Sequence, residues 1–203
     1  MPRLFYPFLV YRSFFFPFFA LSAIVVPCWL LFRLYRLRTS RQPLALRREL
    51  VLLTFVLYLS GLASATLAPN RPSRLHADDT MGMELHPNLA ALTCPPAISR
   101  TDPNARFFCL YNARGNVLLF VPLGILIPLA WRRIGFLKGI LIAIAVSISV
   151  ETVQYFSRAW GSYRLADVND VILNAVGAVI GLTLVSLLLR FRGMSGGPRP
   201  IRE

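Results

Sequence analysis

Five long stretches of this chain carry no charged residue, and they constrain its fold more than any other feature. They cover Phe14–Phe32, Leu50–Pro69, Gly115–Trp131, Gly139–Val150 and Val171–Leu189. A helix of roughly 20 apolar residues crosses the hydrocarbon core of a bilayer, which is about 30 Å thick. We therefore predict an all-α, polytopic integral membrane protein with about five transmembrane helices, over residues 14–32, 50–68, 115–131, 139–157 and 168–189.

The composition argues against a soluble domain. Of the 203 residues, 56% are hydrophobic and 15% are charged, whereas a soluble domain carries about 25% charged residues. The first apolar stretch is long for the core of a signal peptide and lacks a small-x-small cleavage site. We therefore predict that it is retained as a transmembrane helix.

The basic residues gather at three places along the chain. Thirteen of the 22 lie between the first and second predicted helices, between the third and fourth, or after the fifth. With five spans these places share one side of the membrane, which the positive-inside rule assigns to the cytoplasm. We predict an outside N-terminus, a cytoplasmic C-terminus and contacts with membrane lipids. The net charge of +13 is then a topology signal, and no nucleic-acid partner is expected.

The predicted helices divide the chain into three parts. Residues 1–49 hold the first transmembrane helix and a basic cytoplasmic link, residues 50–190 form a membrane domain, and residues 191–203 form a disordered tail. The membrane domain includes an extracytoplasmic loop at 70–114. This loop should be mostly irregular, with one short helix within Leu85–Leu92.

Two of the three cysteines, Cys94 and Cys109, fall in this loop. An oxidising exterior would allow them to form a disulfide, and two free thiols are the alternative. Spacing alone does not choose between these states, because a disulfide requires a particular geometry.

Two of the predicted helices carry a polar or small-residue stripe along one face. The stripe of the helix over 139–157 holds Ser147, Glu151, Gln154 and Arg158. The stripe at the start of the helix over 168–189 holds Asp167, Asp170, Asn174, Gly177 and Gly181. At about 100° per residue each set falls within about 80° of arc. Charged groups at membrane depth are costly, so we predict that both stripes face protein and meet each other.

The second stripe has two distinct parts. Asp167 could act only as an N-cap of its helix. Asn174 lies about 10 Å deeper than Asp167, near the expected level of Glu151. Gly177 and Gly181 form a G-x-x-x-G pattern, which allows another helix to approach closely.

Further polar residues flank the stripes. Arg158 and Arg164 lie between the two helices and are candidate ion-pair partners for the carboxylates. Asn116 should add a third wall from the outer end of the helix over 115–131. Asn112 and Arg114 stand beside it, unless they belong to a solvated loop.

Three motifs resemble the VanZ-like family of bacterial membrane proteins. The first is the run from Asn116 to Gly124, with the letters NVLLFVPLG. The second is Glu151-x-x-Gln154, and the third is the series Arg164, Asp167, Asp170, Asn174, Gly177 and Gly181. The resemblance covers about residues 50–190. It implies an envelope role in the bacterial inner (plasma) membrane, and the founding member of the family is associated with low-level resistance to the glycopeptide teicoplanin.

Several functions are open to these polar residues. A pocket in the outer leaflet could bind a lipid headgroup or another amphiphile, lined by Asn116, Glu151, Gln154, Arg164, Asp170 and Asn174. An enzyme acting on a lipid-linked substrate could use Glu151 as a base and Asp170 as an acid or metal ligand. A small transporter could couple protons through Glu151. The same residues could also serve only to hold the helices together.

The sequence contains no pattern that points to a metal or an organic cofactor. His76 and His86 lack the spacing of metal ligands. There is also no phosphate-binding glycine loop and no nucleophile elbow. We therefore expect no metal site and no cofactor.

Overall fold

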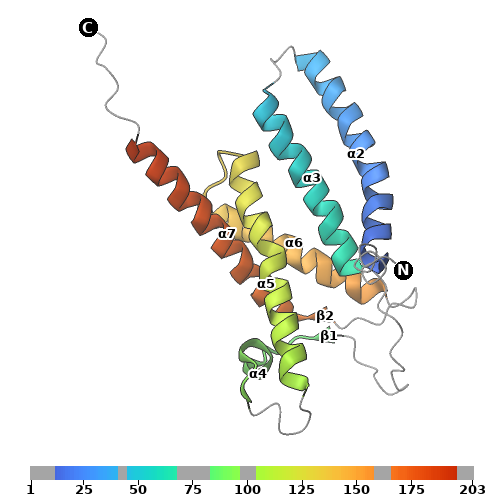
Figure 1. Ribbon diagram of the computed structural model, residues 1–203, viewed down its shortest axis with the longest axis vertical. Helices are drawn as coiled ribbons and strands as arrows, with labels where there is room; N and C mark the ends of the chain where they lie inside the picture. Colours follow the sequence, from blue (N-terminus) through green and yellow to red (C-terminus); the bar gives the residue numbers. More distant parts are fainter. Residues whose placement is uncertain (1–11, 41–44, 68–82, 97–103, 158–165, 196–203) are drawn as a thin grey trace, which may run out of the picture.

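The prediction of five transmembrane helices is confirmed. The computed structural model describes residues 12–40, 45–67, 83–96, 104–157 and 166–195. Within them, five helices are long and apolar enough to cross a membrane (Figure 1): α2 Arg12–Ser40, α3 Leu46–Leu67, α5 Ala105–Ala130, α6 Phe136–Ser157 and α7 Val168–Ser195.

All five helices extend beyond their uncharged cores. Helix α2 continues to Ser40, α5 begins at Ala105 instead of Gly115, and α7 ends at Ser195. Residues 191–195, which the sequence assigned to a disordered tail, are therefore helical. An uncharged stretch marks the part of a helix that lies in hydrocarbon, and a helix can continue into the interface with charged residues. Residues 196–203 lie outside the described part of the chain.

The loop predicted at 70–114 is more ordered than expected where it is described. It contains a short helix, α4 Leu89–Thr93, and its last residues belong to α5. It also contains β1 Met83–Glu84, which pairs in parallel with β2 Ala166–Asp167. Neither strand was predicted from the sequence, because a two-residue strand is too short to show an alternating pattern.

A disulfide fastens α4 to the beginning of α5. It joins Cys94, which caps the C-terminus of α4, to Cys109, and their Cα atoms are 5.8 Å apart. The Nε of Arg106 donates a hydrogen bond of 3.2 Å to the Cys94 carbonyl. The C-terminal end of α4 is thereby held against the first turns of α5.

The centre of the bundle is the contact between α5 and α7. Two α7 glycines lie against the α5 backbone: a Cβ on Gly177 would lie 2.1 Å from the Val117 carbonyl oxygen, and one on Gly181 would lie 2.1 Å from that of Val121. The G-x-x-x-G pattern thus marks a close helix contact, as predicted, and α5 is the partner. Around this contact a buried core forms from Leu62, Phe120, Leu123, Ile127, Ala143 and Ala178.

Helices α2 and α3 form an antiparallel hairpin beside this core (Figure 1). Arg33 on α2 and Glu49 on α3 form a bidentate ion pair, with Nε donating to one carboxylate oxygen at 2.8 Å and Nη2 to the other. Further along the hairpin, Phe18 lies over Gly61. α2 therefore covers the Gly61 face of α3.

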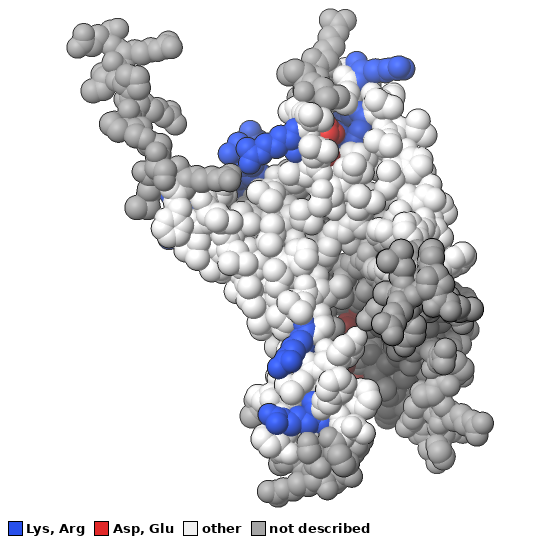
Figure 2. Space-filling view, in the orientation of Figure 1, with Lys and Arg blue, Asp and Glu red and all other residues white. Residues whose placement is uncertain are grey.

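Charged side chains lie at the two ends of the molecule, and a band without them lies between (Figure 2). At one end the described basic residues lie in the last turns of α2, directly after α5, or in the first turns of α3 and α6. They include Arg36, Arg38, Arg47, Arg48, Arg132, Arg133 and Lys138. This uncharged band is what a helical bundle needs to sit in a bilayer.

Candidate functional site

The end of the bundle opposite Arg47, Arg132 and Lys138 carries the polar side chains that the sequence singled out. We call the six described ones the polar cluster: Asn116 on α5, Glu151 and Gln154 on α6, Asp167 on β2, and Asp170 and Asn174 on α7. Arg158 and Arg164, the expected ion-pair partners, lie outside the described residues.

Glu151 joins α6 to the start of α7. Its side chain is buried, with 8% of the residue exposed, and its Oε2 accepts a 3.0 Å hydrogen bond from the backbone N–H of Asp167. Asp167 in turn accepts the N–H of Asn169 on its own Oδ1 at 2.8 Å, which is the geometry of an N-cap. Asp167 therefore has the structural role that the sequence analysis considered.

Asn169 is a buried member of this network that the sequence analysis missed. Its Nδ2 donates to Asp167 Oδ1 at 2.7 Å, and its Oδ1 accepts the backbone N–H of Asn88 at 2.8 Å. Asn88 caps α4 through the N–H of Ala90. The sequence contained a signal for the start of α4, because an asparagine such as Asn88 before an apolar run is typical of a helix N-terminus. It contained none for the bond between Asn88 and Asn169.

Asp170 links α7 to α5 at the exposed side of the cluster. Its Oδ1 accepts hydrogen bonds from the Nδ2 of Asn116 at 2.5 Å and of Asn112 at 3.2 Å. Because α5 begins at Ala105, Asn112 lies one turn before Asn116 on the same helical face. The alternative of a solvated loop for Asn112 and Arg114 is therefore wrong.

Asn174 meets α6 one turn further into the bundle than expected. Its Nδ2 donates to the Ser147 hydroxyl at 2.9 Å, and both residues are almost fully buried. Ser147 precedes Glu151 by one helical turn, so Asn174 lies below the level of Glu151. The amide oxygen of Asn174 has no hydrogen-bond partner within the described part of the chain, which is unusual for a buried acceptor.

Gln154 connects α6 to the end of α3. Its Nε2 donates a 2.9 Å hydrogen bond to the carbonyl oxygen of Thr66. The last four carbonyls of a helix lack partners within that helix, and α3 ends at Leu67. Gln154 therefore satisfies a buried carbonyl that has no partner within α3, which is a structural role.

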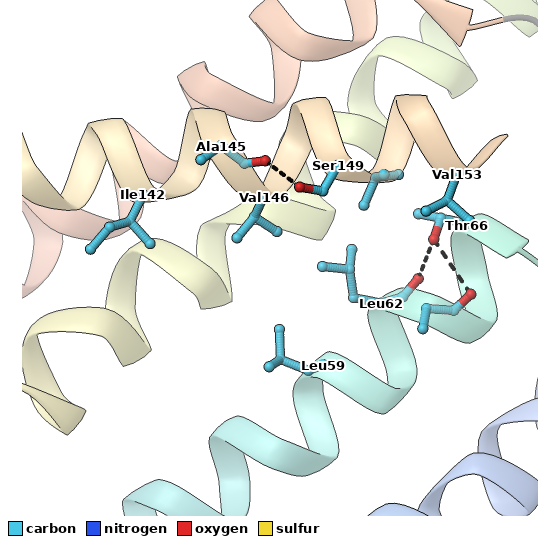
Figure 3. Close-up of a pocket in the computed structure, with 10 residues that line it drawn as sticks. Leu59, Leu62, Thr66, Ile142, Ala145, Val146, Ser149 and Val153 are labelled. Carbon is cyan, nitrogen blue, oxygen red and sulfur yellow. Dashed lines mark hydrogen bonds between the residues drawn. The ribbon is translucent and has the colours of Figure 1, made fainter. Parts of the chain in front are cut away.

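A groove runs between α3 and α6 on a different face of α6 (Figure 3). Its volume is about 390 Å³, and its walls are mainly aliphatic: Leu59, Leu62, Val146, Ser149, Val153 and Thr66 are among its lining residues. We call it the α3–α6 groove. The polar cluster does not line it. The side chains of the cluster are instead hydrogen-bonded to neighbouring side chains, as Asn116 is to Asp170 and Asn174 is to Ser147, or to backbone groups.

These features define a multi-pass helical membrane protein. At one end of its bundle a disulfide joins the short helix α4 to α5, and carboxylates and amides form hydrogen bonds between the helices. Residues 50–189 match the VanZ/LLP1 family, and the chain belongs to this family. Helix α2 precedes the matched region.

One curated relative is Protein VanZ of Enterococcus faecium. It is 33% identical to the chain over 72 residues, which is 36% of this chain and 42% of that protein. The similarity therefore spans less than half the length of this relative. No solved structure matches the chain significantly.

Proposed function

We propose that this protein acts in the cell envelope by binding the headgroup of a lipid or another amphiphile at the polar cluster, and that it contributes to resistance to teicoplanin-type glycopeptides. The observation that carries the proposal is the convergence of α5, α6 and α7 on Glu151 and Asp170 at one end of the bundle. Membership of the VanZ/LLP1 family supports the envelope role.

The chemistry of the cluster suits a ligand with hydrogen-bond donors. Carboxylates and amide oxygens accept hydrogen bonds from amine, hydroxyl or sugar groups. Asp170 is partly exposed, and the neighbouring Asn112 is exposed. A headgroup arriving at the membrane surface would meet these two residues first, while Glu151 and Asn174 lie deeper.

The proposal includes a location in the inner (plasma) membrane, with the polar cluster and the N-terminus outside and the C-terminus in the cytoplasm. The basic residues at the opposite end support this orientation through the positive-inside rule. The disulfide between Cys94 and Cys109 supports it independently, because disulfides persist in oxidising compartments and seldom in the cytoplasm.

Cysteine labelling of intact cells tests this orientation. In a variant with Cys28 replaced by alanine, we expect His86→Cys to react with a membrane-impermeant maleimide, because the His86 side chain is 96% exposed. Ser40→Cys, at the end of α2, should react only after the cells are opened. Reaction of Ser40→Cys from outside intact cells would reverse the proposed topology.

Lipidomic mass spectrometry of the purified protein tests ligand binding. We expect a lipid or amphiphile to co-purify with the wild type and to be depleted roughly tenfold from Glu151→Gln, which is a loss of about 1.4 kcal/mol. Equal lipid content in both proteins would contradict headgroup binding at the cluster. A chemically converted product present only with the wild type would instead favour an enzyme.

A further inference from the structure

The α3–α6 groove is built for hydrocarbon. The two hydroxyl groups in its wall are already bonded within their own helices, Thr66 to the Leu62 carbonyl at 2.8 Å and Ser149 to the Ala145 carbonyl at 2.8 Å (Figure 3). Their protons are therefore not available to water or to a polar ligand. A row of such satisfied hydroxyls among aliphatic side chains is unsuited to a path for ions or protons.

The length of the groove corresponds to one leaflet of the bilayer. On α6 its lining residues extend from Ile142 to Val153, which is about 16 Å along the helix axis. The hydrocarbon core is about 30 Å thick, so the groove spans roughly half of it. Its Val153 end lies beside Gln154 of the polar cluster, and the groove continues from there along α6 toward Lys138 as far as Ile142.

The described helices leave the groove open to the membrane. Helix α2 packs against Gly61 of α3, where Phe18 would lie 3.8 Å from an added Cβ. Leu59 and Ala63, two residues to either side of Gly61, line the groove. At about 100° per residue they point away from the Gly61 face, so α2 and the groove lie on opposite sides of α3.

From these observations we infer that the α3–α6 groove seats the acyl tail of the amphiphile whose headgroup binds the polar cluster. The inference rests on the proposed function and deepens it, because it assigns the ligand to the class of lipid-anchored molecules with a tail about one leaflet long. Such a ligand would enter sideways from the outer leaflet, between α3 and α6. Val150 lines the groove and Glu151 is the next residue, so tail and headgroup would occupy adjacent faces of α6.

The free energy gained when a tail binds in the groove comes from packing contacts and not from transfer out of water. Lipid tails are as apolar as the groove walls, so association within the membrane depends on van der Waals contacts and on polar interactions. We therefore expect the acyl tail to bind the groove with a moderate preference over the rest of the lipid-facing surface. The preference should disappear when the groove is filled.

Photocrosslinking in membranes tests the inference. The probe is a palmitoyl amphiphile with a diazirine in its tail, and the labelled peptides are identified by mass spectrometry. We expect labelling to concentrate on the groove residues of α3 and α6. Ser149→Phe fills the groove and should lower this labelling roughly fivefold, about 1 kcal/mol.

Thr152→Phe is the matched control. Thr152 is exposed like Ser149 and bonds its hydroxyl to its own helix, to the Ile148 carbonyl at 2.7 Å, but it does not line the groove. Its labelling should equal that of the wild type. If Ser149→Phe does not fold, Ala145→Leu fills the same groove with a smaller change.

Two results would overturn the inference. One is uniform labelling of all lipid-facing helices, which would mean that the groove holds bulk lipid only. The other is a second copy of the chain crosslinked through the groove residues. Either result leaves the proposed headgroup site standing if Glu151→Gln still depletes the co-purified lipid. A different pair of results would reject the headgroup site alone: labelling of the wild type concentrates on the groove residues, but Glu151→Gln depletes no co-purified lipid.

Discussion

Replacing Gly181 with alanine is expected to remove most of the folded protein from the membrane. The added Cβ would lie 2.1 Å from the carbonyl oxygen of Val121, 2.9 Å from the amide nitrogen of Ile125 and 3.0 Å from the Cα of Gly124. A carbon–oxygen contact normally needs about 3.3 Å, so α5 and α7 must separate by about 1 Å. These are backbone atoms, which cannot rotate away as a flexible side chain can.

The expected loss of stability is at least about 3 kcal/mol, the upper part of the usual range for overpacking. It should appear as a lower unfolding temperature of the detergent-purified protein and as a lower folded yield by size-exclusion chromatography. Gly177→Ala should behave similarly, because its Cβ would lie 2.1 Å from the Val117 carbonyl oxygen.

Gly115→Ala provides the control within the same pair of helices. A Cβ on Gly115 would have no neighbour within 4 Å. The substitution should be neutral or stabilising by up to about 1 kcal/mol, because alanine favours helix over glycine. Equal unfolding temperatures for Gly115→Ala and Gly181→Ala would contradict the close contact between α5 and α7.

Glu151→Gln is expected to abolish the envelope phenotype while leaving a folded, membrane-inserted protein at normal abundance. Glutamine keeps an oxygen that can accept the N–H of Asp167, the bond that Glu151 makes at 3.0 Å. It removes the negative charge and adds donors where a ligand would present its own. Teicoplanin susceptibility and protein abundance should be measured in the same cells that express the variant.

Gln154→Leu is the control for a structural role within the polar cluster. It removes the hydrogen bond to the Thr66 carbonyl, and an acceptor left unsatisfied there costs about 1–3 kcal/mol. Abundance and phenotype should therefore fall together in this variant. If abundance and phenotype also fall in proportion in Glu151→Gln, the hydrogen bonds of Glu151 only hold the helices together. Normal abundance with an unchanged phenotype would show that Glu151 is not part of the site.

Much of the membrane architecture was predictable from the sequence, because hydrocarbon imposes a length and a polarity that single residues reveal. Uncharged stretches marked the five spans, and clustered arginines marked one end of the bundle. Residue spacing marked the face of α7 that carries Gly177 and Gly181. These signals are local, since each depends only on residues within one helix.

The partners across the interfaces were decided by the tertiary structure. Lipid tails and neighbouring helices are equally apolar, so hydropathy does not distinguish a lipid-facing surface from a packed one. For this reason the sequence predicted a close approach at Gly181 without naming α5, and it gave no sign of the α3–α6 groove.

Backbone groups explain the remaining differences. The acceptor of Gln154 is the carbonyl of Thr66, and the donor to Glu151 is the N–H of Asp167. Every residue carries such groups, so no residue type announces which of them will lack a partner. The sequence by itself determined which side chains would need polar partners inside the membrane. Only the packing of α3, α5, α6 and α7 decided which groups are those partners, because backbone N–H and carbonyl groups become available where helices end and meet.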